Sequence, residues 1–279
     1  MPIKLINTIE AVKIVREVGT KGSSPLVVMD KMGNEYYTKT STLNKPRSEL
    51  INEVFCAFAL QLWKIEVPSI FLIKIPYYLV ERYNDENVKS ISARYTKAHF
   101  DDTLFFGSAN VGTTVEVLDF LPGITKPQFK KLYRPEDLLK IGVFDLWVGN
   151  KDRKPDNPNF LLIPVQSKIG FCAIDHTAAF VHISNYQEVR DIMLRMERNF
   201  SILATPLAKD ILQYLPQKDI EKLKNELQEN IDRFNAHYDQ LVDYVPNEWG
   251  FSGKAKAHLK IFFQDTERNK RIINSFINY

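Results

Sequence analysis

Cysteine is scarce in this chain of 279 residues: only Cys56 and Cys172 are present, and both lie within apolar runs. That scarcity excludes a disulfide framework and indicates a reducing compartment. No apolar run reaches the roughly 18 residues that a membrane-spanning helix needs, and the N-terminal residues show no signal-peptide pattern. We therefore expect a cytoplasmic protein.

Charge imbalance is also small, because 37 basic and 34 acidic residues leave a formal net charge of +3. A balance of this size indicates neither direct binding to nucleic acid nor binding to a membrane. Hydrophobic residues make up 44% of the chain and charged residues 25%, which is ordinary for a globular protein. The length suffices for one large domain or two lobes with a sizeable core.

The chain can be interpreted around a segment that begins with the apolar run Leu138–Val148. Pro135, a favoured first-turn residue, precedes this run, and together they predict a buried helix. A polar loop, Lys151–Asn157, follows the helix. Two further apolar runs, Phe160–Val165 and Ile169–Ile174, are separated by a short polar turn and predict a β-hairpin.

Side chains with oxygen ligands gather at the open end of this predicted hairpin. Antiparallel strands lie about 5 Å apart, so Asn159 before the first strand should meet Asp175 after the second, with Asp152 on the loop above. Carboxylate and amide oxygens suit magnesium. In phosphoryl transfer one Asp orients or deprotonates the acceptor hydroxyl, while an Asn and a second Asp hold the metal ions. We therefore predict Asp152 as the catalytic group and Asp175 as a metal ligand.

Asn157 and Asn159 compete for the second metal position. The spacing of the protein-kinase loop, D-x-x-x-x-N, selects Asn157. Asn159, however, directly precedes Phe160 and is fixed by the hairpin, whereas Asn157 lies within the loop, so we favour Asn159. Asp, Asn and Pro are also ordinary turn residues, and the metal site is predicted only from their ordered combination with the helix and the hairpin.

A glycine-rich turn follows Ile9–Val18, which is predicted as a strand. The candidate nucleotide-binding residues of the turn are Gly19, Gly22, Ser23 and Ser24. Glycine lets backbone amides approach phosphate oxygens closely, because it adds no side chain. The turn is not a Walker A motif, since a strand follows it, at Leu26–Met29, where that motif has a helix. A plain hairpin turn remains the alternative.

The next predicted strand, Glu35–Thr40, contains Lys39, and the segment Pro46–Lys64 has apolar residues at helical spacing. In kinases a strand lysine contacts the phosphates and pairs with a helix glutamate. Glu53 and Glu49 are both candidates for the partner, and Glu53 lies deeper among the apolar positions. We predict the pair Lys39 and Glu53, with an exposed strand lysine as the alternative.

The remaining elements complete a coarse map of the chain. Ile70–Ile75 is predicted as a strand, the polar stretch Tyr83–Asp102 as a surface loop or insertion, and the connection between lobes near Phe105–Leu118. Apolar residues at helical spacing then predict a helical C-terminal part. Its predicted helices are Tyr186–Phe200, Pro206–Leu215, Lys218–Tyr244 and Gly253–Ile277.

The stretch from Phe144 to His176, FDLWVGNKDR…NPNFLL…AIDH, resembles the catalytic segment of HipA-like kinases, particularly the compact HipA-like domain proteins of bacteria. More distantly it is similar to the phosphoinositide-kinase pattern, a DR-x-x-x-N loop followed by a strand that ends in Asp. Asn52-Glu53 also matches an Asn-Glu of the similar proteins. His176-Thr177 stand where a protein kinase has Phe and Gly, a replacement that HipA-like proteins tolerate.

The resemblance implies an α+β, two-lobed protein-kinase-like fold. Its N-terminal lobe would be an antiparallel sheet plus one helix, and its C-terminal lobe mostly helical with a catalytic β-hairpin. We place the nucleotide-binding lobe at residues 1–118 and the catalytic, helical lobe at residues 119–279. The implied cofactors are ATP and magnesium, and the implied acceptor is a Ser or Thr hydroxyl of a protein. The glycine-serine loop would cover the nucleotide, Ser23 or Ser24 would be self-phosphorylated, and an antitoxin or other regulatory partner is expected.

Two alternative functions stay open. A lipid could be the acceptor in place of a protein, although the chain has no long basic run and no amphipathic membrane helix. A kinase-shaped module could also bind a partner without catalysis. The presence of Asp152, Asn159, Asp175 and Lys39 argues against that, because a degenerate kinase usually loses at least one such residue.

Overall fold

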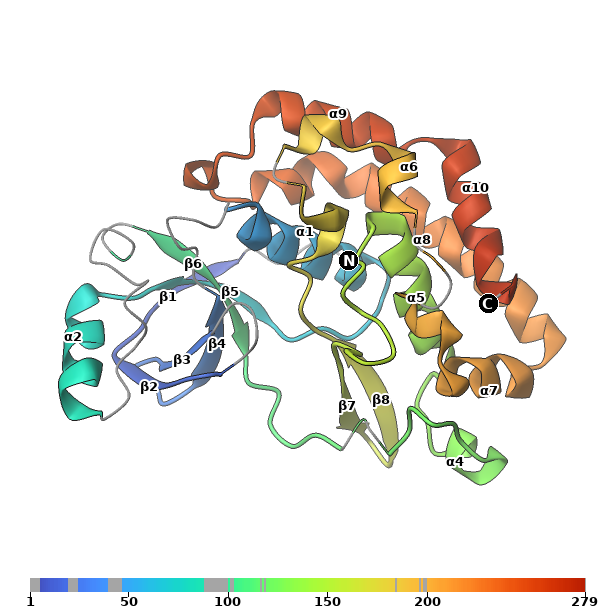
Figure 1. Ribbon diagram of the computed structural model, residues 1–279, viewed down its shortest axis with the longest axis horizontal. Helices are drawn as coiled ribbons and strands as arrows, with labels where there is room; N and C mark the ends of the chain where they lie inside the picture. The colour runs from blue at the N-terminus through green and yellow to red at the C-terminus, as the bar shows by residue number, and fades with distance from the viewer. Residues whose placement is uncertain are drawn as a thin grey trace.

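The computed structural model describes residues 6–19, 25–39, 47–87, 100, 103–115, 117, 119–183, 185–195, 197 and 200–278. Within these residues the chain forms a curled sheet at one end and a larger, mostly helical body that also carries a two-stranded hairpin (Figure 1). Gly22, Ser23 and Ser24 lie outside the described residues. None of the described helices is long and apolar enough to cross a membrane.

The larger sheet has six strands in the order β1-β5-β6-β4-β3-β2. Their bounds are β1 (Asn7–Glu10), β2 (Lys13–Glu17), β3 (Leu26–Met29), β4 (Glu35–Lys39), β5 (Ile70–Lys74) and β6 (Leu104–Ala109). β1 and β5 run parallel, and every other neighbouring pair is antiparallel. The prediction of an antiparallel sheet therefore holds for all strands except β1.

The single strand predicted at Ile9–Val18 is wrong, because this stretch forms β1 and β2 on opposite edges of the sheet. Two successive amides bond to different strands: Ala11 N donates to Lys74 O at 2.9 Å, and Val12 N donates to Met29 O at 2.9 Å. Since only these two residues join the two edges, the edges lie within about 11 Å of each other. The sheet is therefore curled almost into a barrel.

A small hydrophobic core fills the inner side of the curled sheet. It includes Leu26, Val28, Ile73 and Phe105 from the strands. Helix α2 (Tyr77–Glu86) adds the buried residues Leu79 and Val80. The surface loop predicted from Tyr83 is wrong as far as Glu86, since α2 continues to that residue with an Arg82–Glu86 ion pair one turn apart.

The helical body is built from elements on both sides of the hairpin. Its helices are α1 (Ser48–Leu62), α4 (Lys126–Lys130), α5 (Glu136–Val148), α6 (Asp191–Leu194), α7 (Pro206–Tyr214), α8 (Gln217–Asp243), α9 (Gly253–Phe263) and α10 (Thr266–Ser275). Short 3₁₀ helices occur at Ala179–His182, Tyr186–Glu188, Ile202–Ala204, Asn247–Trp249 and Phe276–Asn278. The helices predicted from the periodicity around α1, α5, α7 and α8 are thus confirmed, with small shifts at their ends.

Two helix predictions fail in the C-terminal part. The expected helix Tyr186–Phe200 is instead a 3₁₀ turn followed by the short α6, because the backbone between them is extended at Val189 and Arg190. The expected helix Gly253–Ile277 is divided into α9 and α10. Asp265 caps the second helix by accepting a hydrogen bond from Arg268 N at 2.9 Å. A capping side chain of this kind begins a new helix, although the apolar spacing continues through it.

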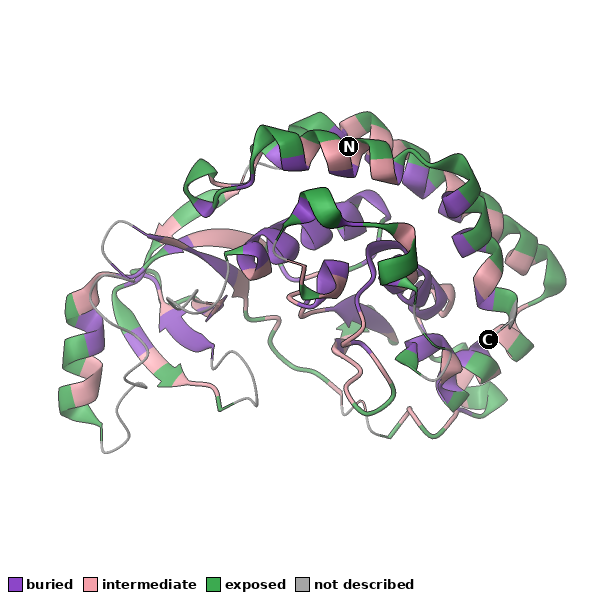
Figure 2. Ribbon diagram, turned by 45° about the horizontal axis from the view of Figure 1, so that its top comes forward, coloured by how far each residue is buried: buried purple, intermediate pink, exposed green. Residues whose placement is uncertain are grey.

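Helix α1 packs into the core of the helical body, not into the core of the sheet. Its Phe55 lies against Phe180, Phe234 and Phe263, with ring centroids 5.5 to 5.6 Å apart. Helix α5 is buried on nearly all sides (Figure 2), which explains why its sequence is a continuous apolar run. The position of α1 is therefore fixed relative to α8 and to the 3₁₀ helix Ala179–His182.

The predicted hairpin is confirmed as β7 (Phe160–Val165) and β8 (Lys168–Ala173). Phe160 pairs with Ala173 at its open end. A few residues after β6 the chain already contacts the hairpin, because Val115 N donates a hydrogen bond to Leu162 O at 2.8 Å. The predicted connection between lobes near Phe105–Leu118 and the boundary after residue 118 stay predictions.

Candidate active site

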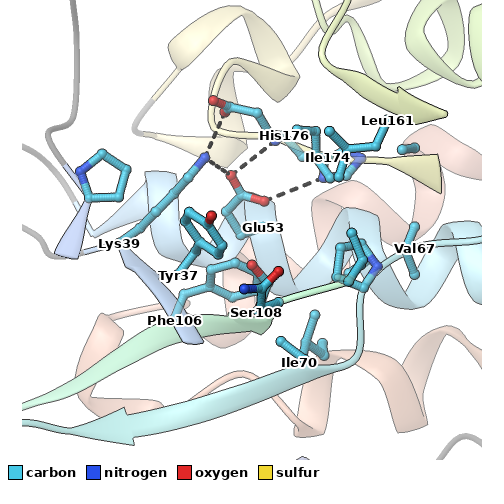
Figure 3. Close-up of a pocket in the computed structure, with 18 of the residues that line it drawn as sticks. Tyr37, Lys39, Glu53, Val67, Ile70, Phe106, Ser108, Leu161, Ile174 and His176 are labelled. Carbon is cyan, nitrogen blue, oxygen red and sulfur yellow. Dashed lines mark hydrogen bonds and ion pairs between the residues drawn. The ribbon is translucent and has the colours of Figure 1, made fainter. Parts of the chain in front are cut away.

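Three predicted residues from separate elements meet at one point (Figure 3). Lys39 Nζ, at the end of β4, lies 2.6 Å from Glu53 Oε1 on α1 and 2.7 Å from Asp175 Oδ1, which follows β8. The structure thus brings together the predicted lysine, its predicted glutamate partner and the predicted metal ligand. Glu49 is not the partner of Lys39 in these contacts, because Glu53 occupies that position.

The electrostatics of this group stabilise its charged forms. Burial opposes the charge on Lys39, but the carboxylates of Glu53 and Asp175 outweigh burial and raise the pKa of Lys39. Burial likewise opposes the charge on both carboxylates, and the nearby ammonium outweighs it, so the pKa of Glu53 and the pKa of Asp175 are lowered. At neutral pH the lysine is therefore a cation held between two anions.

His176 also holds Glu53 in position. Its backbone N donates to Glu53 Oε1 at 3.0 Å, and its ring Nδ1 lies 3.3 Å from Glu53 Oε2. Burial lowers the pKa of His176, which favours a neutral imidazole with Nδ1 as the donor. The residue that replaces the phenylalanine of protein kinases is thus a hydrogen-bond partner of the glutamate.

We predict that the contribution of Glu53 to stability is lost in acid. A carboxylate with a lowered pKa stabilises the fold fully above its unfolded-state pKa of about 4.3, and the contribution disappears as the pH falls below that value. Glu53→Gln should cost about 1.5–3 kcal/mol at pH 7, because charged hydrogen bonds are lost. Its free energy of unfolding should fall less steeply than that of the wild type from pH 5 to about pH 3.

Denaturant unfolding at several pH values tests this prediction. Glu229→Gln, at an exposed glutamate of α8, is the matched control and should keep the wild-type slope. Equal acid slopes for the wild type and Glu53→Gln would contradict the role assigned to this carboxylate.

The loop before the hairpin places Asp152 beside both candidate asparagines. Asn159 Nδ2 donates to Asp152 Oδ2 at 3.2 Å, whereas Asn157 Nδ2 donates to the Asp152 backbone O at 3.2 Å. Asn159 therefore contacts the carboxylate itself, and its amide oxygen remains for another ligand. Asn157 instead closes the loop, in which it also pairs with Lys154.

Arg153, fully buried, ties this loop to the open end of the hairpin. Its Nε donates to Asn159 O at 3.0 Å and its Nη2 donates to Ile174 O at 2.7 Å. Its Nη1 pairs with Asp145 on α5, which is also fully buried. One guanidinium thus holds the backbone at Asn159 and the residue before Asp175, and it anchors both to a buried helix.

The backbone is left-handed at both predicted metal ligands. Asn159 has φ of 44° and Asp175 has φ of 56°. Left-handed backbone costs about 1–2 kcal/mol in a non-glycine residue, so the surroundings must hold it in place. The hydrogen bonds of Arg153 to the carbonyl of Asn159 and to that of Ile174, the residue before Asp175, hold the backbone there.

A cavity of about 350 Å³ opens between the sheet and the hairpin, with Lys39, Glu53, Asp175 and His176 at its polar end. Val18 and Pro25 also line it, and these residues flank the glycine-serine turn. Gly19 lies at the start of that turn in the described chain, while Gly22, Ser23 and Ser24 do not belong to the described residues. The size and the mixed lining suit a small molecule with an anionic part.

Asn52 is a residue of this site that the sequence did not assign a role. Its buried Nδ2 donates to Thr177 O and to Ala179 O, each at 2.9 Å, and its Oδ1 accepts from Tyr186 OH at 2.7 Å. Asn52 therefore fixes the segment after Asp175 to α1, while the adjacent Glu53 fixes Lys39. The sequence feature that could have revealed this role is an amide side chain next to Glu53 in an otherwise apolar stretch.

A sheet lysine paired with a helix glutamate above a hairpin that ends in Asp is the architecture of the protein-kinase-like fold. The sequence model of the HipA-like kinase family matches residues 11–275, and the chain belongs to this family. The chain is thus a kinase of the HipA-like class.

Among solved structures, one similarity supports the fold. The chain is similar to the Helicobacter pylori proinflammatory kinase CtkA, with a TM-score of 0.54 and 12% identity over 97% of each chain. Weaker similarity links it to the Golgi casein kinase with Mn/ADP bound, with a TM-score of 0.49, 14% identity, 97% of this chain and 73% of that one. The FAT and kinase domain of CtTel1 is more distant, with a TM-score of 0.31, 12% identity, 94% of this chain and 22% of that one. The comparison with curated proteins found no match.

Proposed function

We propose that this kinase transfers the γ-phosphoryl group of ATP, with magnesium, to a Ser or Thr hydroxyl of a protein. The observation that carries the proposal is the group of Lys39, Glu53 and Asp175, joined by contacts of 2.6 and 2.7 Å at the polar end of a cavity. A buried cation held between carboxylates is suited to binding phosphate oxygens. The family supports the transfer reaction, and the Ser or Thr acceptor follows from the resemblance.

Each residue has one role in the proposed reaction. Lys39 contacts the phosphates of the nucleotide, and Glu53 holds its ammonium in position. Asp152 accepts a hydrogen bond from the acceptor hydroxyl and orients it toward the phosphorus, or takes its proton. Arg153 keeps the loop and the hairpin in register, so these groups do not reorganise when substrate binds.

The donor set fits magnesium. A carboxylate from Asp175 and an amide oxygen from Asn159 are hard ligands, and the Oδ1 atom of Asp175 is already oriented by Thr177 Oγ1 at 2.8 Å. The described residues contain no cluster of three or more His, Cys, Asp or Glu that could hold a metal alone. A magnesium ion bound by Asp175 and Asn159 would stabilise the charge that develops on the transferred phosphate.

Asn159 remains our choice for the second ligand over Asn157. Its amide nitrogen is engaged with the Asp152 carboxylate, which leaves the amide oxygen available. Asn157 uses its side chain on the loop backbone. A structure with nucleotide and metal that places the Asn157 oxygen on the ion would overturn this choice.

Transfer of radioactive label from γ-labelled ATP tests the proposal. Purified protein is incubated with magnesium and either a dephosphorylated protein extract or phosphoinositide vesicles, and acid hydrolysis identifies the labelled amino acid. We expect label on phosphoserine or phosphothreonine. Label on lipid would replace the protein acceptor, and no label on any acceptor, the chain itself included, would overturn kinase activity of this site.

Asp175→Ala is predicted to weaken magnesium-dependent nucleotide binding more than tenfold, because it removes a charged metal ligand. Calorimetric titration of a non-hydrolysable ATP analogue, with magnesium and with EDTA, measures the effect. The variant should gain little affinity from magnesium, whereas Asp156→Ala, at an exposed carboxylate of the neighbouring loop, should behave as the wild type. Identical metal titrations of Asp175→Ala and the wild type would place the metal elsewhere.

Self-phosphorylation at Ser23 or Ser24 remains a prediction from the resemblance. A phosphate there would add about −1.5 to −2 charges beside the nucleotide phosphates and should weaken ATP binding. Mass spectrometry after incubation with ATP and magnesium decides it. An antitoxin or other regulatory partner and a cytoplasmic location likewise remain predictions.

A further inference from the structure

We propose that a patch of exposed lysines docks an acidic segment of the protein substrate. This lysine patch consists of Lys126, Lys130, Lys131 and Lys168. The inference rests on the proposed function, since the docked segment belongs to the protein that accepts the phosphate. It deepens that function, because it names a charge that the substrate carries at a distance from its acceptor hydroxyl.

The lysine patch lies at the closed end of the catalytic hairpin. Lys168 begins β8 at the turn, and Lys126 and Lys130 begin and end α4. A backbone hydrogen bond joins the end of α4 to the hairpin, because Ile169 N donates to Lys131 O at 3.0 Å. Lys131 and Lys168 are therefore neighbours in space. Figure 1 shows α4 and the hairpin turn at the same edge of the molecule.

Helix α4 is held in place by its own contacts, so the lysine patch is preformed. Its N-terminus has a capping box, in which Thr125 N donates to Gln128 Oε1 at 2.8 Å. Phe129 packs edge-on against Tyr214 of α7, with ring centroids 5.5 Å apart. A surface that is ordered before binding loses less conformational entropy when a partner docks.

The charges of the lysine patch are not neutralised within the chain. Among the residues that the structure describes, no carboxylate pairs with any of the four lysines. Lysines of α8, α9 and α10 do form ion pairs, in Lys224–Glu221, Lys260–Asp239 and Lys270–Glu267. Like charges one helical turn apart, as at Lys126 and Lys130, destabilise a helix. The patch is therefore complementary to an acidic partner.

The arginine that follows the patch in the chain shows the contrast. Arg134 Nη2 lies 3.2 Å from Asp137 Oδ1 and 3.6 Å from Glu226 Oε1, so its charge is already compensated. Residues 119–134 contain four basic side chains and one acidic one, Asp119. The excess of positive charge therefore comes from the lysines and not from the arginine.

Charge and position favour a protein segment over nucleic acid or a membrane. The basic excess is local, whereas the whole chain has a net charge of only +3. Proteins that bind nucleic acid commonly make about 6–10 phosphate contacts, more than four lysines provide. None of the large apolar residues that the described chain exposes lies in α4 or at the hairpin turn. The patch therefore offers no side chain for insertion into lipid.

The position of the patch sets a minimum distance between the docked segment and the acceptor. β7 runs from Phe160, next to Asn159, to Val165 at the turn. A strand of this length spans roughly 17–20 Å. An extended peptide covers at most about 3.3–3.6 Å per residue. At least about five residues must therefore separate the acidic segment from the Ser or Thr that reaches Asp152.

Binding of a defined acidic peptide tests the docking surface. Fluorescence anisotropy measures the dissociation constant of labelled hexaglutamate, with labelled hexaglutamine as the neutral probe. Lys130→Glu with Lys131→Glu should weaken hexaglutamate binding at least about tenfold, because two attractions become repulsions. Lys168→Glu changes the patch from a separate segment and should weaken it several-fold. Added salt should weaken wild-type binding, since it screens exposed charges.

A variant of equal charge gives the matched control. Lys31→Glu with Lys254→Glu makes the same change in net charge at two exposed lysines outside the patch. It should bind hexaglutamate within about twofold of the wild type, because distant exposed charges are screened. An equal loss in this control and in the patch variants, or no loss in either, would overturn the docking surface. Patch-dependent binding of an RNA oligonucleotide or of phosphatidylserine vesicles, with no binding of hexaglutamate, would overturn the acidic segment as the partner.

Label transfer to the dephosphorylated protein extract connects the surface to the substrate. Hexaglutamate added as a competitor should lower label incorporation by the wild type, and Lys130→Glu with Lys131→Glu should incorporate less label without any competitor. Label incorporation unchanged by hexaglutamate and by the substitutions would overturn substrate docking while leaving the proposed kinase function intact. A wild type that transfers no label to any acceptor would overturn the proposed function itself.

Discussion

Asp152→Asn is expected to reduce phosphoryl transfer by about 10²- to 10⁴-fold while nucleotide affinity stays within a few-fold of the wild type. This is the loss in rate expected when a general base or an orienting carboxylate is removed. The substitution keeps the shape of the side chain, and its remaining oxygen can still accept the 3.2 Å hydrogen bond from Asn159. Nucleotide binding should persist, because Lys39 and Asp175 are untouched.

Measuring the turnover and the nucleotide affinity of the same preparation tests this prediction. Asp156→Asn is the matched control, since its carboxylate is on the same loop with 76% of its side chain exposed. It should keep normal turnover. More than a tenth of normal turnover in Asp152→Asn would remove Asp152 from the catalytic role.

Arg153→Met is expected to cost about 3–5 kcal/mol of unfolding free energy, because it leaves the fully buried Asp145 without its counter-ion. Burial already raises the pKa of Asp145 to about 7. Without Arg153, whose charge lowers this pKa, the carboxyl keeps its proton to a higher pH, and the loss should grow as the pH rises through 7 and above. Denaturant unfolding from pH 5 to pH 8 measures the loss.

A double variant separates stability from positioning. Arg153→Met with Asp145→Leu replaces the ion pair by apolar side chains and should recover much of the lost stability. It should still bind metal and nucleotide weakly, because the carbonyls of Asn159 and Ile174 have lost their shared donor. Arg82→Met, at an exposed ion pair, should cost less than about 1 kcal/mol. Full metal affinity in the double variant would show that Arg153 serves stability alone.

The parts of the site that follow from local patterns were predictable. A two-stranded hairpin has its two ends side by side, so Asn159 was expected to meet Asp175. The register instead places Asn159 opposite Ile174, one residue before Asp175, and Ile174 N donates to Asn159 O at 3.1 Å. The Lys39–Glu53 pair was also predictable, because few buried acidic residues on α1 could reach a lysine on a strand of the sheet. Their functional roles remain predictions.

The parts that depend on long-range closure were not predictable. Nothing local to Ala11 and Val12 indicates that successive amides bond to different strands, because both partners lie in distant segments. The same holds for Asn52, whose acceptors follow Asp175, and for Arg153, which entered the sequence analysis only as part of the DR-x-x-x-N pattern. A side chain that joins remote backbone segments leaves no periodic signal.

The curled sheet has a consequence for the order in which this protein assembles. β1 pairs with β5 in a register that joins Asn7 to Phe71, so this strand cannot dock until a long stretch of later chain has been made. Pairings so distant in sequence close slowly, because the entropy of the loop is lost before the contacts form. Until β1 docks, β5 has an unpaired edge with which a strand of another chain could pair. Proline at Ala11 or Val12 would remove a backbone donor that joins the two edges of the sheet. Either substitution should therefore leave a nascent chain prone to aggregate.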